Sequence, residues 1–451
     1  MATRKTDSSL STRTRDFEYA TMRKVSRRLI PFLFLLYVAA YLDRINIGFA
    51  QLQMKGTLGF SDSVYGLGTG IFFIGYFLFE VPSNLILART GARVWIARIM
   101  ISWGVISSAM AMVRTPAGFY ALRFLLGVAE AGFFPGIIYY MSRWFPAAER
   151  ASAISRFMTA AAVSGIVGGP LSGVLFTLDG VMGLAGWQWI FLAEGVPSVV
   201  LGVAVLWFLT DRPEDARWLS PAEREYLGAK MRAEVDLIMR RGHVSLRHAL
   251  VHPIVWRLSL LSFTLLVGLY SISFWLPQIV KSFSGLANVE VAIISAIPYV
   301  VATVAMLIVG THSDRSRERC RHIAGSALVG AAGIAASGYA HSPVPGLIAL
   351  SAAAAGIFSA IPIFWALPTA FLSGTAAAGA IALINSLGNL GGFAGPYLIG
   401  RVRDVTGNFT GSLLTIAGLL VVSAALALSL RRSPAIAEAS RPALRETGAT
   451  K

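Results

Sequence analysis

Apolar residues run through most of this chain in long continuous stretches, which charged residues, glycine or proline interrupt at intervals. A helix needs about 20 mostly apolar residues to cross the ~30 Å hydrocarbon core of a bilayer. The stretches do not alternate with period two, which disfavours a transmembrane barrel. They predict twelve membrane-spanning helices, which begin near residues 29, 65, 94, 117, 151, 187, 256, 290, 322, 344, 376 and 409.

A charged segment separates the sixth predicted span from the seventh and contains Ser220-Pro221-Ala222-Glu223, a helix-start signal. We therefore expect an all-α integral membrane protein built from two six-helix halves. The halves echo each other, since Arg315 follows Arg89 and Pro396 follows Pro170 at one offset of 226 residues. The expected parts are a cytoplasmic amino-terminal tail, a first bundle, a cytoplasmic linker, a second bundle and a cytoplasmic carboxyl-terminal tail. They cover residues 1–28, 29–210, 211–255, 256–430 and 431–451, in that order.

Composition and charge agree with a membrane protein. Of 451 residues 55% are apolar and 14% are charged, against about 25% charged in soluble domains. The net charge is +16, and 32 of the 39 Lys and Arg residues lie on one predicted side of the membrane. This asymmetry orients both termini to the cytoplasm, and no basic stripe with interleaved aromatic residues indicates nucleic-acid binding. The amino terminus has no cleavable signal pattern, so we expect the first span to be retained.

Cysteine and histidine usage gives no sign of a metal site. The single Cys320 excludes an intrachain disulfide and a cysteine-based metal site. The six histidines show no metal-ligand pairing with carboxylates, and we expect them at solvated loop positions. No metal and no cofactor is expected.

Six charged residues fall inside the predicted spans, namely Asp43, Arg44, Glu80, Arg123, Glu130 and Glu194. A charge at the centre of a span costs on the order of 2.5 to 3.5 kcal/mol, so each needs a partner or a wet cavity. The helical rise places Asp43 and Glu130 within ~14 to 20 Å of the outer surface, near the middle of the core. Arg123 and Glu130 project from one face of the fourth span, and Gly127 between them leaves that face shallow.

These charges are suited to an anion and to protons. A guanidinium keeps its charge and matches the geometry of a carboxylate, so Arg44 and Arg123 are candidates for substrate binding. Burial disfavours an isolated carboxylate and a neighbouring arginine favours it, so Asp43 and Glu130 are candidates for proton coupling. The alternative is a static lattice of arginine and acid that ties the helices together. Glu80 and Glu194 fit a gating or structural role better than substrate contact.

Several motifs resemble those of the major facilitator superfamily, and specifically of its anion:cation symporter family of bacterial organic-acid carriers. The loop GTHSDRSRER at 310–319 fits the loop signature of the superfamily. The family match is more specific and is similar to carriers of the tartrate or dicarboxylate type. Its motifs are AYLDRINIGFA at 40–50, FEVPSNLIL at 79–87, RFLLGVAEAGFFPG at 123–136, WFPAAERA at 144–151, GWQWIFLAEGVP at 186–197 and ALINSLGNLGGFAGPYLIG at 382–400.

The resemblance implies secondary transport by alternating access around a midplane site. In sugar-acid carriers of this family the matching acid pair is assigned to proton coupling and the matching arginine to substrate. The resemblance adds four substrate-binding candidates whose positions face the central cavity: Tyr41, Tyr76, Trp365 and Asn385. The chain departs from the sugar-acid carriers at Ala161, where they place a side-chain amide.

The loop signature also implies a latch that holds the helices in one gate state. Its candidate gating or structural residues are Arg89 and Arg93 in the first half, and Asp314 and Arg315 in the second. The first-half copy departs from the signature, because Asn84 stands where glycine is usual and Ala88 where aspartate is usual.

We therefore expect a proton-coupled symporter in the bacterial cytoplasmic membrane that imports a small organic anion. Its expected partners are the anion, protons or another cation, and the lipid bilayer, and we expect a monomer. Tartrate, another small dicarboxylate, a sugar acid and an aromatic carboxylate all fit the pattern. Two alternatives are an efflux or antiport carrier for amphipathic compounds and a non-transporting membrane sensor of organic acids. An enzyme is not expected, because the sequence offers no set of nucleophile, base and orienting group.

Overall fold

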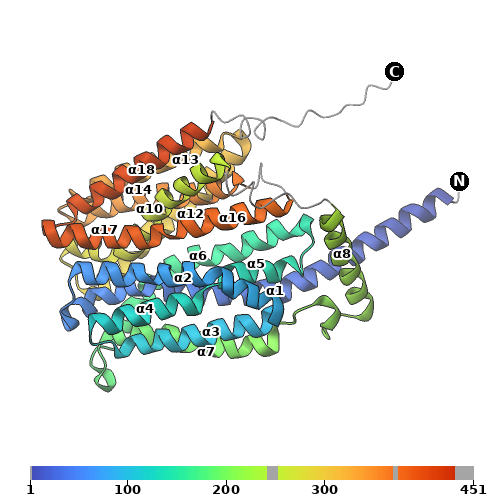
Figure 1. Cartoon of the computed structure of the whole chain (residues 1–451), viewed down its shortest axis with the longest axis horizontal. Helices are drawn as coiled ribbons and strands as arrows, with labels where there is room; N and C mark the ends of the chain where they lie inside the picture. Colours follow the sequence, from blue (N-terminus) through green and yellow to red (C-terminus); the bar gives the residue numbers. More distant parts are fainter. Residues whose placement is uncertain (1–2, 241–251, 369–373, 432–451) are drawn as a thin grey trace. The chain divides into compact units, whose positions relative to one another are not determined.

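The computed structural model describes residues 3–240, 252–368 and 374–431, in which helices are the only regular secondary structure (Figure 1). The chain forms two compact units. The first takes in described residues 3–58 and 71–240, and the second takes in 59–70, 252–368 and 374–431. Helix α2 (Asp62–Thr90) is therefore shared, since its first residues group with the second unit.

The other helices of the first unit include the rest of the first six predicted spans, in the predicted order, and then α8 in the predicted linker. They are α1 (Thr3–Leu58), α3 (Ala92–Ala109), α4 (Pro116–Glu130), α5 (Phe133–Ser142), α6 (Ala147–Phe176), α7 (Gly186–Phe208) and α8 (Pro221–Arg240), with short 3-10 helices η1 (Met110–Met112), η2 (Val181–Gly183) and η3 (Pro213–Asp215). The second unit holds α10 (Pro253–Ser284), α11 (Asn288–Ile294), α12 (Ala296–Ser316), α13 (Arg319–Ser337), α14 (Pro343–Trp365), α16 (Gly374–Asn389), α17 (Gly391–Thr406) and α18 (Thr410–Arg431).

The all-helical membrane fold expected from the sequence is confirmed. Within the described residues, ten helical segments are long and apolar enough to cross a membrane. Helices also stand where the ninth and eleventh spans are expected. The ninth position is taken by α13, and the eleventh is divided between α16 and α17, which have 16 residues each. The described part of the chain thus has a helix at every predicted span.

Small residues let helices within each unit approach closely. In the first unit α3 packs along α7 (Figure 1), and a Cβ on Gly104 would lie 2.7 Å from the carbonyl oxygen of Gly195. In the second unit α13 packs along α14 in the same way, because a Cβ on Gly356 would lie 2.3 Å from the backbone nitrogen of Gly330. Close backbone contact of this kind is a main source of helix association in lipid.

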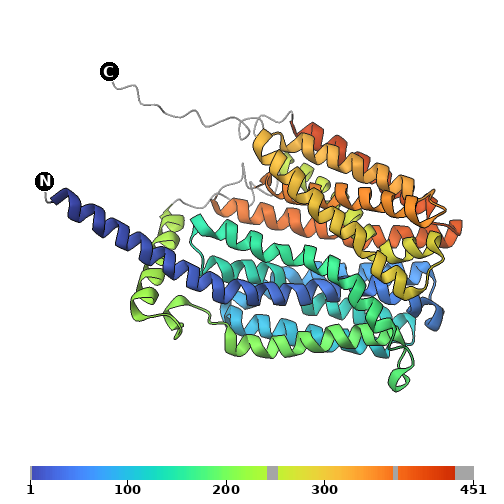
Figure 2. The same cartoon turned by 180° about the vertical axis from the view of Figure 1, so that it is seen from behind.

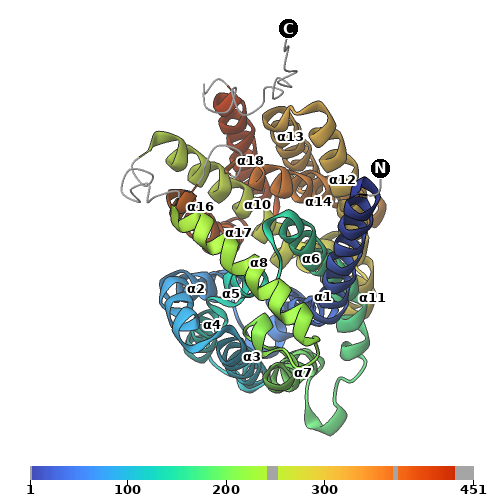
Figure 3. The ribbon, with the colours of Figure 1, turned by 90° about the vertical axis from the view of Figure 1, so that its right-hand side faces the viewer.

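Helix α1 does not begin at the predicted end of the tail, since it runs without a break from Thr3 into the first span. Its amino-terminal part extends past the other helices of its unit, and α8 crosses beside it (Figures 2 and 3). Lys24 of α1 pairs with Glu223 of α8 at 2.8 Å. The predicted capping box is confirmed, because Glu223 accepts from the Ser220 backbone and the Ser220 hydroxyl accepts from the Glu223 backbone.

The pKa of Glu223 reflects this setting. Burial raises the pKa of the carboxyl, but the hydrogen bonds from Lys24 and from the Ser220 backbone outweigh burial, and the pKa lies below its ordinary value. The carboxylate of Glu223 is therefore charged at neutral pH, and it ties the start of α8 to α1.

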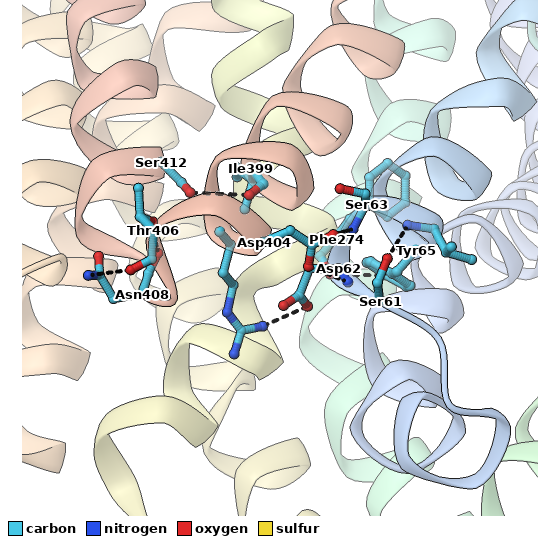
Figure 4. A network of polar contacts seen from close by, with 12 residues as sticks. Ser61, Asp62, Ser63, Tyr65, Phe274, Ile399, Asp404, Thr406, Asn408 and Ser412 are labelled. Atoms are coloured by element: carbon cyan, nitrogen blue, oxygen red, sulfur yellow. Dashed lines mark hydrogen bonds and ion pairs between the residues drawn. The ribbon is translucent and has the colours of Figure 1, made fainter.

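An aspartate of α17 caps the start of α2 within the second unit (Figure 4). The two carboxylate oxygens of Asp404 accept from the backbone N–H groups of Asp62 and Ser63 at 3.0 and 2.8 Å. Arg403 pairs with the side chain of Asp62 at 2.9 Å. The charge of Arg403 is therefore neutralised within the unit.

Two of the histidines differ from expectation. His312 lies in α12 and His322 in α13, so neither is in a loop, and their ring nitrogens Nδ1 and Nε2 are 2.7 Å apart. His312 is exposed and His322 is half-buried. Among the described residues no group of three or more His, Cys, Asp or Glu side chains could hold a metal ion.

Candidate functional site

The fourth predicted span is broken at its middle, which the apolar pattern did not predict. Helix α4 ends at Glu130, Ala131 leaves the helical region with ψ 129°, and Gly132 takes the left-handed region with φ 87° before α5 begins. The hydroxyl of Ser83 donates to the carbonyl of Ala131 at 2.6 Å, so the break is satisfied from α2. Broken helices near the midplane are typical of binding sites in secondary transporters.

Glu130 sits at this break and forms an ion pair with Arg44 of α1. The guanidinium of Arg44 donates from Nη2 to Oε1 of Glu130. The side chain of Glu130 is 1% exposed, and that of Arg44 is 14% exposed. The pair is a charge-assisted hydrogen bond in a largely buried place, which is stronger than a bond between neutral groups.

Arg123 brings a second guanidinium to the same place. It is fully buried, at 0% exposure, and it lies on α4 two turns before Glu130. Its Cζ atom lies 5.1 Å from the ring centroid of Phe72. The Cζ atom of Arg44 lies 5.7 Å from the same ring and 5.6 Å from that of Tyr76. The two arginines thus share the aromatic face of α2.

Gly127 explains how α4 comes so close to α2. A Cβ at this position would lie 2.0 Å from the backbone oxygen of Phe72, a distance that no side chain tolerates. The shallow face predicted from the sequence is therefore filled by a neighbouring helix. This close approach places Arg123 and Glu130 beside Phe72 and Tyr76.

Asp43 belongs to a separate polar group on another side of α1. Its Oδ1 accepts from the hydroxyl of Ser107 and from the amide of Asn46, the latter at 3.2 Å. Among the described residues Oδ2 has no hydrogen-bond partner, although the side chain is 1% exposed. Glu194 of α7 lies close enough for its carboxyl to interact with Asp43 and with Asn46.

The charges of this region do not balance when every group is ionised. Two guanidiniums, of Arg44 and Arg123, face three buried carboxyls, of Asp43, Glu130 and Glu194. All five belong to the first unit. Uncompensated charge is costly in a buried site, so the protonation of these carboxyls and the binding of other charges nearby are linked in free energy.

The other predicted substrate residues are divided between the units. Tyr41 and Tyr76 are buried in the first unit, and Tyr41 meets Tyr37 edge to face at 6.2 Å between ring centroids. Trp365 ends α14 and packs against the core of the second unit, and Asn385 is half-buried in α16. Glu80 is buried towards the end of α2, and its backbone oxygen accepts from the Asn84 amide at 2.8 Å.

The predicted latch residues are exposed in both units. In the first, Arg89 lies in the last turn of α2, and the backbone N–H of Arg93 donates to Asp211 at 2.9 Å. Asp211 thus caps the start of α3. In the second, the side chain of Asp314 is 76% exposed and lies 3.9 Å from Arg319, and Arg315 is exposed.

Three members of this region were not selected from the sequence. Asn46 lies one turn after Asp43, a spacing that a search for polar residues on the Asp43 face would have found. Ser107 and Phe72 carry no comparable signal, because serine and phenylalanine are common in membrane spans. Their roles depend on which helices pack together.

The model of the "Major Facilitator Superfamily" matches residues 33–396. A protein of Agrobacterium vitis named "Putative tartrate transporter" is 52% identical over 434 residues, which is 95% of each chain. A "Quinolone resistance transporter" of Acinetobacter baumannii is 43% identical over 401 residues, 88% of this chain and 92% of that one.

Solved structures agree at the level of the fold. A bacterial homologue of the human lysosomal transporter Spinster, in an inward-facing and unoccupied conformation, matches with a TM-score of 0.76. The match covers 93% of this chain and 99% of that one at 17% identity. The xylose transporter XylE of E. coli matches with a TM-score of 0.71 at 16% identity, over 90% of this chain and 98% of that one.

Proposed function

Because the chain belongs to the Major Facilitator Superfamily, whose members are membrane transporters and not enzymes, we propose that it imports a small organic anion together with protons. The proposed substrate is a carboxylate of the tartrate or dicarboxylate type. The similarity to proteins named for tartrate transport, at 52% identity over most of the chain, supports this class. The observation that carries the coupling is the buried pair of Arg44 and Glu130.

Glu130 and the substrate compete for one guanidinium in this proposal. With Glu130 ionised, its carboxylate accepts from Arg44, and Arg44 is occupied. A proton arriving at Glu130 removes that negative charge and frees the guanidinium for a substrate carboxylate. Arg123, which keeps its charge at any pH, completes a two-armed clamp on the anion. One proton bound thus goes with one carboxylate bound.

Asp43 supplies a second protonation site in the proposed cycle. Its free Oδ2 can carry a proton while Oδ1 keeps its bonds to Ser107 and Asn46. Moving one negative charge inward against ~100 mV costs ~2.3 kcal/mol, so two protons offset the cost for a dicarboxylate dianion and let a monovalent anion gain from the membrane potential. Two carboxyls in the first unit make this stoichiometry available.

Alternating access completes the proposed mechanism, with Trp365 and Asn385 of the second unit as further substrate contacts. Glu80, Glu194 and the latch residues would act in gating. We place the protein as a monomer in the cytoplasmic membrane of a bacterium, with both termini inside. The asymmetry of basic residues along the sequence supports this orientation.

Export of an amphipathic compound is a second candidate, because a relative that is 43% identical is named for quinolone resistance. A drug exporter needs a wide apolar pocket. The described part of the first unit instead places two arginines against Phe72, which favours an anion.

Uptake into proteoliposomes tests the proposed function. An imposed gradient, acid outside, should drive accumulation of radiolabelled tartrate or another dicarboxylate, and a protonophore should abolish it. Uptake of norfloxacin against its gradient into acid-loaded inside-out vesicles, with no carboxylate transported, would instead establish the exporter.

A further inference from the structure

A cavity of about 920 Å³ opens beside α1, away from the charged site described above. One wall is a single stripe of α1, at positions 19, 20, 23, 24, 27, 28, 31, 32 and 35, which helical periodicity brings to one face. The other wall consists of Phe208, the last residue of α7, and Trp218 of the linker. All of these residues belong to the first unit.

The stripe changes from basic to apolar along the helix. Arg23, Lys24, Arg27 and Arg28 line the cavity at its amino-terminal end, followed by Pro31, Phe32 and Leu35. From Leu29 to Leu42 the chain carries no charged residue, so the boundary between water and lipid falls near Arg28. Leu35 is 47% exposed and lies about 10 Å deeper along the helix axis than Arg28. The cavity therefore extends from the headgroup level into the hydrocarbon.

The guanidinium of Arg28 contacts two aromatic rings at this boundary. Its Cζ atom lies 4.7 Å from the ring centroid of Phe208 and 5.0 Å from that of Trp218. Trp218 in turn stacks on buried Trp144 at 5.4 Å between centroids. The buried Nε of Arg28 has no hydrogen-bond partner among the described residues.

Of the four basic residues that line the cavity, Lys24 pairs with Glu223. In the described part of the chain no carboxylate lies within ion-pair distance of the other three, Arg23, Arg27 and Arg28. A guanidinium fits a phosphate with two parallel hydrogen bonds. Three arginines above an apolar wall therefore match a ligand with an anionic head and an apolar tail.

We propose that this cavity binds an acidic phospholipid, with its phosphate on Arg23, Arg27 and Arg28 and one acyl chain along Pro31, Phe32 and Leu35. Basic pockets at the membrane boundary are suited to such headgroups. The planar Arg28, fixed between two rings, sets the position of the phosphate. The bound lipid anchors the part of α1 that leads, without a break, to Asp43 and Arg44.

Native mass spectrometry of the purified full chain tests this site, with phosphatidylglycerol and phosphatidylcholine of identical acyl chains as probes. The wild-type protein should retain phosphatidylglycerol preferentially. The double variant R27Q/R28Q should bind it roughly thirtyfold more weakly, because each basic residue near an anionic lipid contributes about fivefold. The control R156Q/R232Q removes two exposed arginines of the same unit, outside the cavity, and should bind as the wild type does.

Two further measurements keep the result interpretable. The variant R28K keeps the charge but not the planar ring contact, and should show an intermediate affinity. A melting temperature of R27Q/R28Q equal to that of the wild type in phosphatidylcholine shows that the variant folds. Equal retention of the two lipids, unchanged affinity in R27Q/R28Q, or full displacement of the lipid by millimolar inorganic phosphate would overturn the proposal.

Discussion

Arg44 on α1 donates a hydrogen bond to Glu130, which is the last residue of α4. The positive charge of Arg44 is thus neutralised at the break between α4 and α5. Arg123 lies two turns earlier on α4 and contacts the same aromatic ring of α2. A carboxylate that enters this region meets two guanidiniums, one of which already holds a carboxylate. In the proposed cycle, protonation of Glu130 removes its negative charge, and Arg44 can then pair with the carboxylate of the substrate.

Arg123 is the residue whose loss should weaken anion binding most directly. In the variant R123A the substrate loses a fixed positive charge, and we expect at least about a thirtyfold rise in Kd, in line with ~2 to 5 kcal/mol for a buried charged partner. The variant R123K keeps the charge but not the fork, and should lose less. A thermal-shift titration with dicarboxylates measures both, and wild-type affinity in R123A would end its role as a clamp.

Gly127 should tolerate no side chain. In G127A the new Cβ meets the Phe72 carbonyl, so α2 and α4 must separate, which we expect to destabilise the fold by about 1 to 3 kcal/mol and to reduce uptake. The control is G418A, at an exposed helical position with open space around it. It should be neutral or slightly stabilising. Equal melting temperatures for the two variants would contradict the close packing.

Asp404 should hold the start of α2 in the second unit. The variant D404N removes a charge that accepts from two N–H groups of a helix amino terminus, a loss of about 1 kcal/mol. Hydrogen exchange at Asp62 and Ser63 should accelerate about fivefold. D314N, which changes a highly exposed acid elsewhere in the unit, serves as the control, and unchanged exchange in D404N would refute the capping role.

Glu223 should make the contact between α8 and α1 sensitive to acid. Its folded-state pKa is below the ordinary value, so its stabilising contribution is full above the unfolded pKa and is lost as pH falls through the folded pKa. The protection of amides at the start of α8 against hydrogen exchange, taken relative to their intrinsic rates at each pH, should therefore fall as the pH drops below the ordinary pKa range of a glutamate. The variant E223Q should exchange fast already at pH 7, and a pH response equal to the wild type's would show that another group is responsible.

The sequence predicted the helical fold because apolar runs and breaks are local signals. It also predicted that Asp43 and Glu130 lie at a similar depth, since helical rise converts residue number into height. The structure brings Arg44 and Glu130 into contact but gives Asp43 different partners, Ser107 and Asn46. Depth was predictable, whereas pairing was not.

The features that could not be predicted from the sequence depend on contacts between helices that lie far apart along the chain. The break after Glu130 needs Gly132 in the left-handed region and Ser83 from another helix, and neither is visible in an apolar run. The occupant of the shallow face at Gly127 was likewise open until α2 was seen to fill it. Roles that depend on which helices pack together require the tertiary structure.

The central claim is that protonation of Glu130 couples the anion to the proton gradient, and the variant E130Q tests it most directly. Glutamine keeps the shape of the protonated acid but cannot exchange a proton. In proteoliposomes we expect E130Q to retain counterflow, in which unlabelled substrate inside exchanges for labelled substrate outside, and to lose accumulation driven by a pH gradient. Undiminished proton-driven accumulation in E130Q, beside wild-type counterflow, would contradict the account.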